Sequence, residues 1–117
     1  MMQAQNLLII MDDEHNKNVL GYNGHPVVKT PHLDRLAAGG TVYANAYSSS
    51  PICVPARAAF ATGKYVHDNR CWDNAIAYDG HIPSWAHMLR GAGHTATSIG
   101  KLHYTNDDVD GGFSEQI

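Results

Sequence analysis

The sequence has few cysteines, little excess charge and no long apolar run. Only 2 of its 117 residues are cysteine, which is too few for a disulfide framework. A net charge of −3 and a pI near 6.2 provide no broad basic surface, so we expect neither nucleic acid nor an anionic membrane as a partner. A small or medium-sized ligand is the better expectation.

The N-terminal segment lacks the features of a signal peptide or a membrane span. It has no positively charged start, and its apolar run, residues 7–11, ends at carboxylates. These absences predict a cytoplasmic chain with no membrane partner.

Histidine is abundant, but its spacing does not indicate a zinc site. The 8 histidines are scattered, and the HExxH and CxxC spacings typical of zinc ligands are absent. We expect most of these histidines to lie on the surface or in loops.

Apolar periodicity and turn residues predict an alternation of strands and helices. Strands are expected over 7–11, 41–47 and 95–99, and helices over 31–39, 56–62 and 83–89. The first strand is a continuous apolar run, typical of a strand buried on both faces of a parallel sheet. The predicted fold class is therefore α/β, a mostly parallel, doubly wound sheet with helices on both faces. The acidic, glycine-rich tail after Tyr104 is predicted to be a loop.

Three polar clusters follow the predicted strands. Asp12 and Asp13 come after the first strand, residues 53–57 after the second, and Lys101 with His103 after the third. Ligands of doubly wound sheets bind beyond the carboxyl ends of the strands. The three clusters therefore predict a catalytic site at that edge.

Each cluster also has an ordinary interpretation. Asp12 and Asp13 are either a solvated strand end or helix cap, or the start of a site for a hard cation such as calcium or magnesium. Lys101 and His103, taken alone, are ordinary loop residues. Cys53 is either a buried small apolar residue or a reactive thiol.

The sequence around Cys53 favours the reactive thiol. PICVPARAAFATG, residues 51–63, sets this cysteine between two prolines, with Arg57 following at the spacing of one helical turn. A thiol at a helix N-terminus beside an arginine lies in a positive field that also attracts anions. Cysteine phosphatases place their arginine further from the cysteine. The order C-V-P-A-R instead resembles the C-x-P-x-R signature of the sulfatase family, within the alkaline-phosphatase-like superfamily.

The resemblance extends on both sides of this signature. NLLIIMDDEH is similar to the family's metal-binding first strand, TPHLDRLAAGGTVYANAY to the helix and strand that follow, and ATGKYVHDN to the downstream half of the signature. SIGKLHY resembles the G-K-x-H element, and together with WDNAIAYDG it is most similar to choline-sulfatase-like enzymes. Residues 1–117 are thus identified as the N-terminal part of a single sulfatase catalytic domain.

The resemblance implies a formylglycine-dependent sulfuric ester hydrolase acting on a small-molecule sulfate ester. Cys53 matches the cysteine that a formylglycine-generating maturation enzyme oxidises to Cα-formylglycine, whose hydrated aldehyde is the nucleophile. Arg57 matches the residue that holds the formylglycine, and Lys101 and His103 match residues that contact the sulfate oxygens and the diol. These four residues are the predicted catalytic set. His67, in a variable segment, is either a surface residue or part of the site.

The resemblance also implies a divalent metal, usually calcium. Asp12 and Asp13 match the first two carboxylate ligands, and Cys53 in its modified form is the third ligand predicted from this chain. Calcium takes about 6 to 8 oxygen ligands. The family's other ligands lie downstream in longer chains, so we expect a remaining C-terminal part of the enzyme, or a second polypeptide, to supply them. Two alternatives stay open: a phosphonate or phosphate ester hydrolase of the same superfamily, and an inactive truncated remnant.

Overall fold

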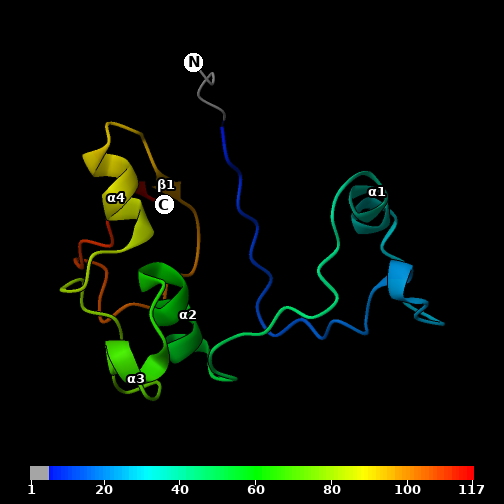
Figure 1. Cartoon of the computed structure of the whole chain (residues 1–117), viewed down its shortest axis with the longest axis horizontal. Helices are drawn as coiled ribbons and strands as arrows, with labels where there is room; N and C mark the ends of the chain where they lie inside the picture. The colour runs from blue at the N-terminus through cyan, green and yellow to red at the C-terminus, as the bar shows by residue number, and fades with distance from the viewer. Residues whose placement is uncertain (1–5) are drawn as a thin grey trace. The chain divides into compact units, whose positions relative to one another are not determined.

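Two units make up the chain in the computed structural model, which describes residues 6–117. The first unit ends at Ala46, and the second comprises Tyr47–Ile117. Figure 1 shows their elements, which are η1 (Gly21–Asn23) and α1 (Pro31–Gly39) in the first unit, and α2 (Cys53–Thr62), α3 (Val66–Asn69), α4 (Trp85–Gly91), β1 (Thr97–Ser98) and β2 (Glu115–Gln116) in the second.

Helix α1 begins where the sequence predicts, and hydrogen bonds tie it to η1. Pro31 occupies the first helical position, where its missing N–H costs little. Thr30 Oγ1 accepts a hydrogen bond from the Gly21 N–H at 2.8 Å and donates one to Asp34 at 2.7 Å. Asp34 also accepts from the Tyr22 N–H at 2.9 Å. A Cβ atom at Gly21 would collide with the Asp34 carboxylate, so a larger residue there would require this side chain to move.

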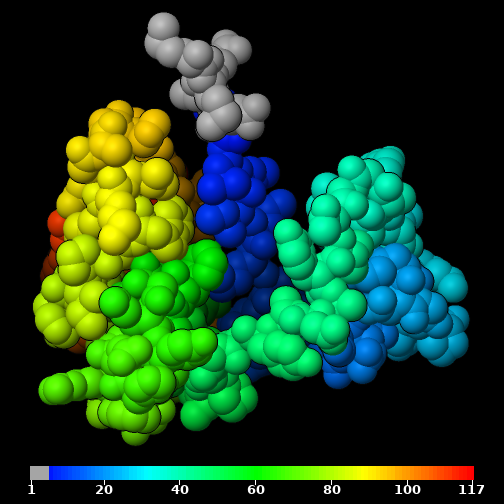
Figure 2. All heavy atoms as spheres, in the orientation of Figure 1, coloured from blue at the N-terminus to red at the C-terminus, as the bar shows by residue number. Residues whose placement is uncertain are grey.

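The predicted first strand is wrong, because residues 7–11 pair with no other strand among residues 6–117. The side chains expected to be buried on two faces are solvent-exposed, and Leu7, Leu8 and Ile10 are 77%, 82% and 83% exposed. Figure 2 shows this segment as a narrow dark blue strip. A strand needs a neighbouring backbone to pair with and packed layers to cover its faces, and residues 6–117 supply neither here.

The predicted second strand, residues 41–47, is wrong for the same reason. Its β-favouring side chains, among them Val42, Tyr43 and Tyr47, are exposed, and its backbone forms no ladder within the described part of the chain. Residues with high β-propensity form a strand only when their side chains pack against neighbouring strands or another layer of the fold. Residues 6–117 therefore contain one short strand pair, and the doubly wound sheet stays a prediction.

Helix α2 is the centre of the second unit. Its buried residues are mostly small, namely Val54, Pro55, Ala58, Ala59 and Ala61. Small side chains allow close approach, and α2 contacts both α3 and α4 (Figure 1). The core cluster joins Ala58 of α2 to Cys71 and Tyr78, and Ile82 and Tyr104 pack against it. None of the helices in residues 6–117 combines the length and the apolar character needed to cross a bilayer.

Two helices begin at residues other than those predicted, and α3 was not predicted. Helix α2 starts at Cys53 rather than Ala56, because Pro55 falls in the first turn, where an N–H has no partner within the helix. Helix α4 starts at Trp85, since Ser84 acts as its N-cap and accepts the His87 N–H at 3.2 Å.

The tail forms a strand, so the prediction of a loop after Tyr104 is wrong at its end. Strand β2 pairs in parallel with β1, with Thr97 opposite Glu115 and Ser98 opposite Gln116. Parallel pairing between segments separated by a long connection is the arrangement found in α/β proteins.

The tail is also fastened to α4. Ser84, which is only 1% exposed, donates its hydroxyl hydrogen to the Gly111 carbonyl at 2.6 Å. Arg90 makes a bidentate ion pair with Asp110, at 2.7 and 3.0 Å. This pair holds the pKa of the Asp110 carboxyl down to about 2. We call these two contacts the tail latch.

Candidate active site

Cys53 is the first residue of α2, and Asn74 holds this end of the helix. The preceding residue, Ile52, is extended and has no side chain able to cap the helix. The side-chain oxygen of Asn74 takes that role, accepting the Val54 N–H at 3.2 Å and the Cys53 thiol at 3.5 Å. The thiol is partly exposed. A helix N-terminus presents N–H groups and a partial positive charge, which favours a bound anion or a thiolate.

Arg57 follows one turn later and connects α2 to the segment after β1. Its Nη1 donates a hydrogen bond to the backbone carbonyl of Lys101. The guanidinium is thereby held on the same helix as Cys53, beside the segment that carries Lys101 and His103. The structure thus brings together the predicted signature and the predicted G-K-x-H element.

His103 has a backbone conformation that is uncommon for residues other than glycine. Its φ is +61°, in the left-handed region, which a histidine adopts at an energetic cost. Residues in this region cluster at functional sites, where the surrounding structure maintains them. The conformation turns the chain between β1 and the partly buried Tyr104, whose pKa burial raises to about 12.

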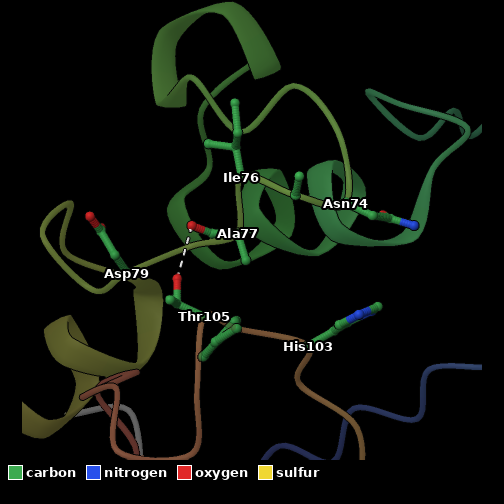
Figure 3. A pocket seen from close by; sticks show the side chains of 8 residues that line it. Asn74, Ile76, Ala77, Asp79, His103 and Thr105 are labelled. Carbon is green, nitrogen blue, oxygen red and sulfur yellow. Dashed lines mark hydrogen bonds between the residues drawn. The ribbon is translucent and has the colours of Figure 1, made fainter.

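A pocket of about 490 Å³ lies between the segment after α3 and the segment after β1. Its lining consists of Asn74, Ala75, Ile76, Ala77, Asp79, His103, Tyr104 and Thr105. In Figure 3 the side chains of Asn74 and His103 extend toward the same side, and Thr105 reaches across to the Ala77 carbonyl. Because Asn74 also binds the Cys53 thiol, this pocket adjoins the predicted nucleophile.

The two cysteines occupy different environments. Cys71 is 5% exposed, within the core cluster, and burial raises the pKa of its thiol. Cys53 lies at a helix end within reach of solvent. Of the two cysteines, only Cys53 combines solvent access with a position at a helix N-terminus and a nearby arginine.

Asp12 and Asp13 lie in the first unit, at the end of the exposed apolar segment. Both are exposed, and the Asp12 carboxylate lies 2.5 Å from Nδ1 of His15. This hydrogen bond, with a second one to the Val19 carbonyl, raises the pKa of the His15 imidazole. Two carboxylates are hard oxygen donors of the kind that bind a divalent cation such as calcium. Calcium needs further oxygen ligands beyond these two. Among residues 6–117 no group of three or more metal-ligating side chains is assembled, so the metal set Asp12, Asp13 and Cys53 stays a prediction.

One residue of the site was missed at the level of sequence, and one candidate lies on the surface. Asn74 is 21 residues from Cys53, and only the folded chain brings its side chain to the thiol. Its signal in the sequence is limited to its place in WDNAIAYDG, a segment similar to the family. His67 has an exposed side chain that stacks on Tyr65 with ring centroids 5.6 Å apart. These contacts match its surface interpretation.

Comparison with known proteins defines the class to which this fold and site belong. The family described as Sulfatase matches residues 5–116, nearly the whole chain, so the chain belongs to the sulfatase family. The family's α/β fold agrees with the parallel strand pair and the helices seen here. The resemblance read from the C-x-P-x-R signature is confirmed.

Individual relatives give the same assignment. The chain is 38% identical to choline-sulfatase of Rhizobium meliloti (strain 1021) over 96% of its own length and 22% of the relative's. It is 35% identical to arylsulfatase K of Bos taurus, over 88% of this chain and 19% of the relative. It is 36% identical to an uncharacterized sulfatase, YidJ, of Escherichia coli (strain K12), over 94% and 22%. The chain therefore spans about a fifth of the length of these relatives.

Proposed function

We propose that this chain carries the nucleophile end of the active site of a sulfuric ester hydrolase. The observation that supports this most directly is the arrangement at the start of α2. There Asn74 holds Cys53 at the helix N-terminus, and Arg57 is fixed one turn later against the Lys101 carbonyl. Together with membership of the sulfatase family, this arrangement favours a sulfate ester as the substrate.

The charges around Cys53 suit an anionic group. Backbone N–H groups of the first turn of α2 and the Arg57 guanidinium provide positive potential where the sulfate would bind. We assign to Lys101 and His103 the contacts with the sulfate oxygens, and to Asn74 the orientation of the Cys53 side chain. Arg57 is already held in place by its hydrogen bond to the Lys101 carbonyl, so this donor needs little reorganisation as charge develops.

Two groups supplied after synthesis complete the chemistry. Once a formylglycine-generating maturation enzyme has converted Cys53, its hydrated aldehyde provides an oxygen nucleophile for the sulfur atom. Asp12 and Asp13, together with ligands from the rest of the domain, would hold a divalent cation, calcium in view of the family, which would supply polarisation of the sulfate.

The pocket beside Asn74 is where we place the alcohol part of the substrate. It adjoins the nucleophile through Asn74 and His103, and the rest of its lining combines apolar side chains such as Ile76 with the polar side chains of Asp79 and Thr105. Since one relative is named a choline-sulfatase, choline sulfate is the first substrate to test.

The test uses the complete enzyme, meaning this chain together with the segment that supplies the rest of the domain. We expect hydrolysis of choline sulfate or p-nitrophenyl sulfate, and much slower hydrolysis of the matched phosphate and phosphonate esters. The peptide that contains Cys53 should be about 18 Da lighter than the unmodified peptide, because CH2SH becomes CHO. Cys53→Ala should reduce turnover by about a thousandfold or more.

The matched control is Cys71→Ala, which changes the other cysteine. It should lower thermal stability, because Cys71 is in the core, and leave turnover of the folded enzyme near that of the wild type. Full activity with an intact thiol at Cys53 would refute the formylglycine mechanism. A clear preference for phosphate or phosphonate esters would identify the sister hydrolase instead.

A further inference from the structure

His15 connects a predicted metal ligand to a turn of the first unit. Its Nδ1 lies 2.5 Å from Asp12 Oδ2, and its Nε2 lies 3.2 Å from the backbone carbonyl of Val19. The His15 side chain is 27% exposed, whereas that of Asp12 is 68% exposed. Both partners are acceptors, so the ring makes the two hydrogen bonds together when both of its nitrogens carry a proton, and the carboxylate that it binds faces solvent.

The backbone between the two residues is shaped for this contact. Glu14 has a φ of +60°, in the left-handed region that non-glycine residues seldom adopt. This conformation reverses the chain locally, so that His15 can reach back to a residue three positions earlier. Such a conformation persists only where surrounding contacts maintain it.

The far end of the imidazole is also anchored. Val19 closes a turn in which its N–H donates to the Asn16 carbonyl at 2.9 Å, and the Asn16 side chain accepts from the Asn18 N–H at 2.9 Å. The Asn23 side chain donates to the Lys17 carbonyl at 2.6 Å. The Val19 carbonyl that binds His15 therefore belongs to an ordered turn.

We propose that His15 is a positioning residue for the metal ligand Asp12. The hydrogen bond from His15 uses Oδ2, so Oδ1 is the oxygen of Asp12 that can bind a cation without breaking it. Fixing the carboxylate before the cation arrives lowers the entropy lost on binding. This inference rests on the metal site of the proposed function.

The experiment is calcium titration by isothermal calorimetry into the metal-stripped complete enzyme. His15→Ala should weaken calcium binding by about 10-fold or more, the effect typical of losing an outer-shell partner of a ligand. His15→Gln, whose amide can still donate to Asp12, should recover most of the affinity. His94→Ala, which alters another exposed histidine, should bind calcium like the wild type.

The outcomes separate a positioning role from a structural one. His15→Ala with wild-type calcium affinity would overturn the proposal. The proposal would also be overturned if His15→Ala and His15→Gln lost calcium affinity equally and lowered the melting temperature of the metal-free enzyme equally. In that case His15 would only stabilise the turn. If the wild type itself bound no calcium, the metal site of the proposed function would fail first, and the role of His15 with it.

Discussion

The two units of the chain differ in how much of their own core they contain. In the second unit, a cluster of buried residues from α2 and the loops that follow it supports the helices. In the described part of the first unit, Leu20 is the only buried apolar residue, and α1 has none. The first unit is instead ordered by hydrogen bonds, such as those of Thr30 with Asp34 and of His15 with Asp12. Local order therefore does not require a local core.

The proposed site residues therefore fall into two groups, one in a unit with a buried core and one in a unit ordered by hydrogen bonds. Cys53, Arg57, Lys101 and His103 belong to the unit with a core, whereas Asp12 and Asp13 belong to the unit that lacks one. A residue that only supports the core should affect stability more than calcium binding. A residue that only binds the cation should do the reverse.

The largest effect that sharpens this comparison is expected at Asp12. Asp12→Asn should weaken calcium binding by about 10- to 100-fold, because a neutral amide oxygen replaces an anionic ligand of a hard cation. The melting temperature of the metal-free enzyme should change little, since the side chain is exposed and the amide oxygen of asparagine can still accept the hydrogen bond from His15. Calorimetric titration and thermal unfolding of the complete enzyme measure the two quantities.

Asp107→Asn is the control for this variant, because it removes a carboxylate at another exposed position. It should leave both the calcium affinity and the melting temperature unchanged. Equal calcium affinities in Asp12→Asn and Asp107→Asn would show that the metal is bound elsewhere.

Sequence patterns predicted the helices better than the strands, for a physical reason. Helix signals are local: Pro31 marks the start of α1, and Gly63, with a φ of +64°, ends α2. A strand depends on a distant partner. Residues 7–11 have the composition of a buried strand, but no segment among residues 6–117 pairs with them.

The same distinction applies to the candidate site. Cys53 and Arg57 stand in one short signature, so their helical turn follows from local spacing. The hydrogen bond of Asn74 to the thiol and the pairing of β1 with β2 join residues far apart in the sequence. No periodicity in the sequence indicates such contacts, because they are set by tertiary packing.

Ser84 is expected to show the reverse of Asp12, with a change in stability and none in calcium affinity, and this effect should be of intermediate size. Ser84→Ala removes the N-cap of α4 and leaves the buried Gly111 carbonyl without the hydroxyl that binds it. We expect a loss of about 1 to 2 kcal/mol in the free energy of unfolding, with an unchanged calcium affinity. Chemical denaturation of the complete enzyme tests this, and Ser49→Ala, at an exposed position, is the control. If Ser84→Ala lowered the calcium affinity as much as Asp12→Asn does, the assignment of calcium binding to the first unit and of core stability to the second would be wrong.

The smallest effect on stability is expected at the Arg90–Asp110 ion pair of the tail latch. Asp110 pairs with Arg90, accepts the Gly112 N–H at 2.9 Å and lies 3.6 Å from His87 Nε2. These contacts lower the pKa of its carboxyl in the folded state from about 3.8 to about 2. A depressed folded-state pKa gives stability that is fully present above the unfolded value and is lost as the pH falls from about 4 toward 2.

Asp110→Asn should therefore lower the melting temperature by a few degrees at most near pH 7, and less at high salt, because both side chains are largely exposed to solvent. The difference from the wild type should shrink as the pH is lowered and vanish below about pH 2, where the wild-type carboxyl is mostly protonated. Thermal unfolding across this pH range measures it, with Asp108→Asn in the same tail as the matched control. A difference that persisted unchanged at low pH would show that Asp110 contributes through packing rather than through its charge.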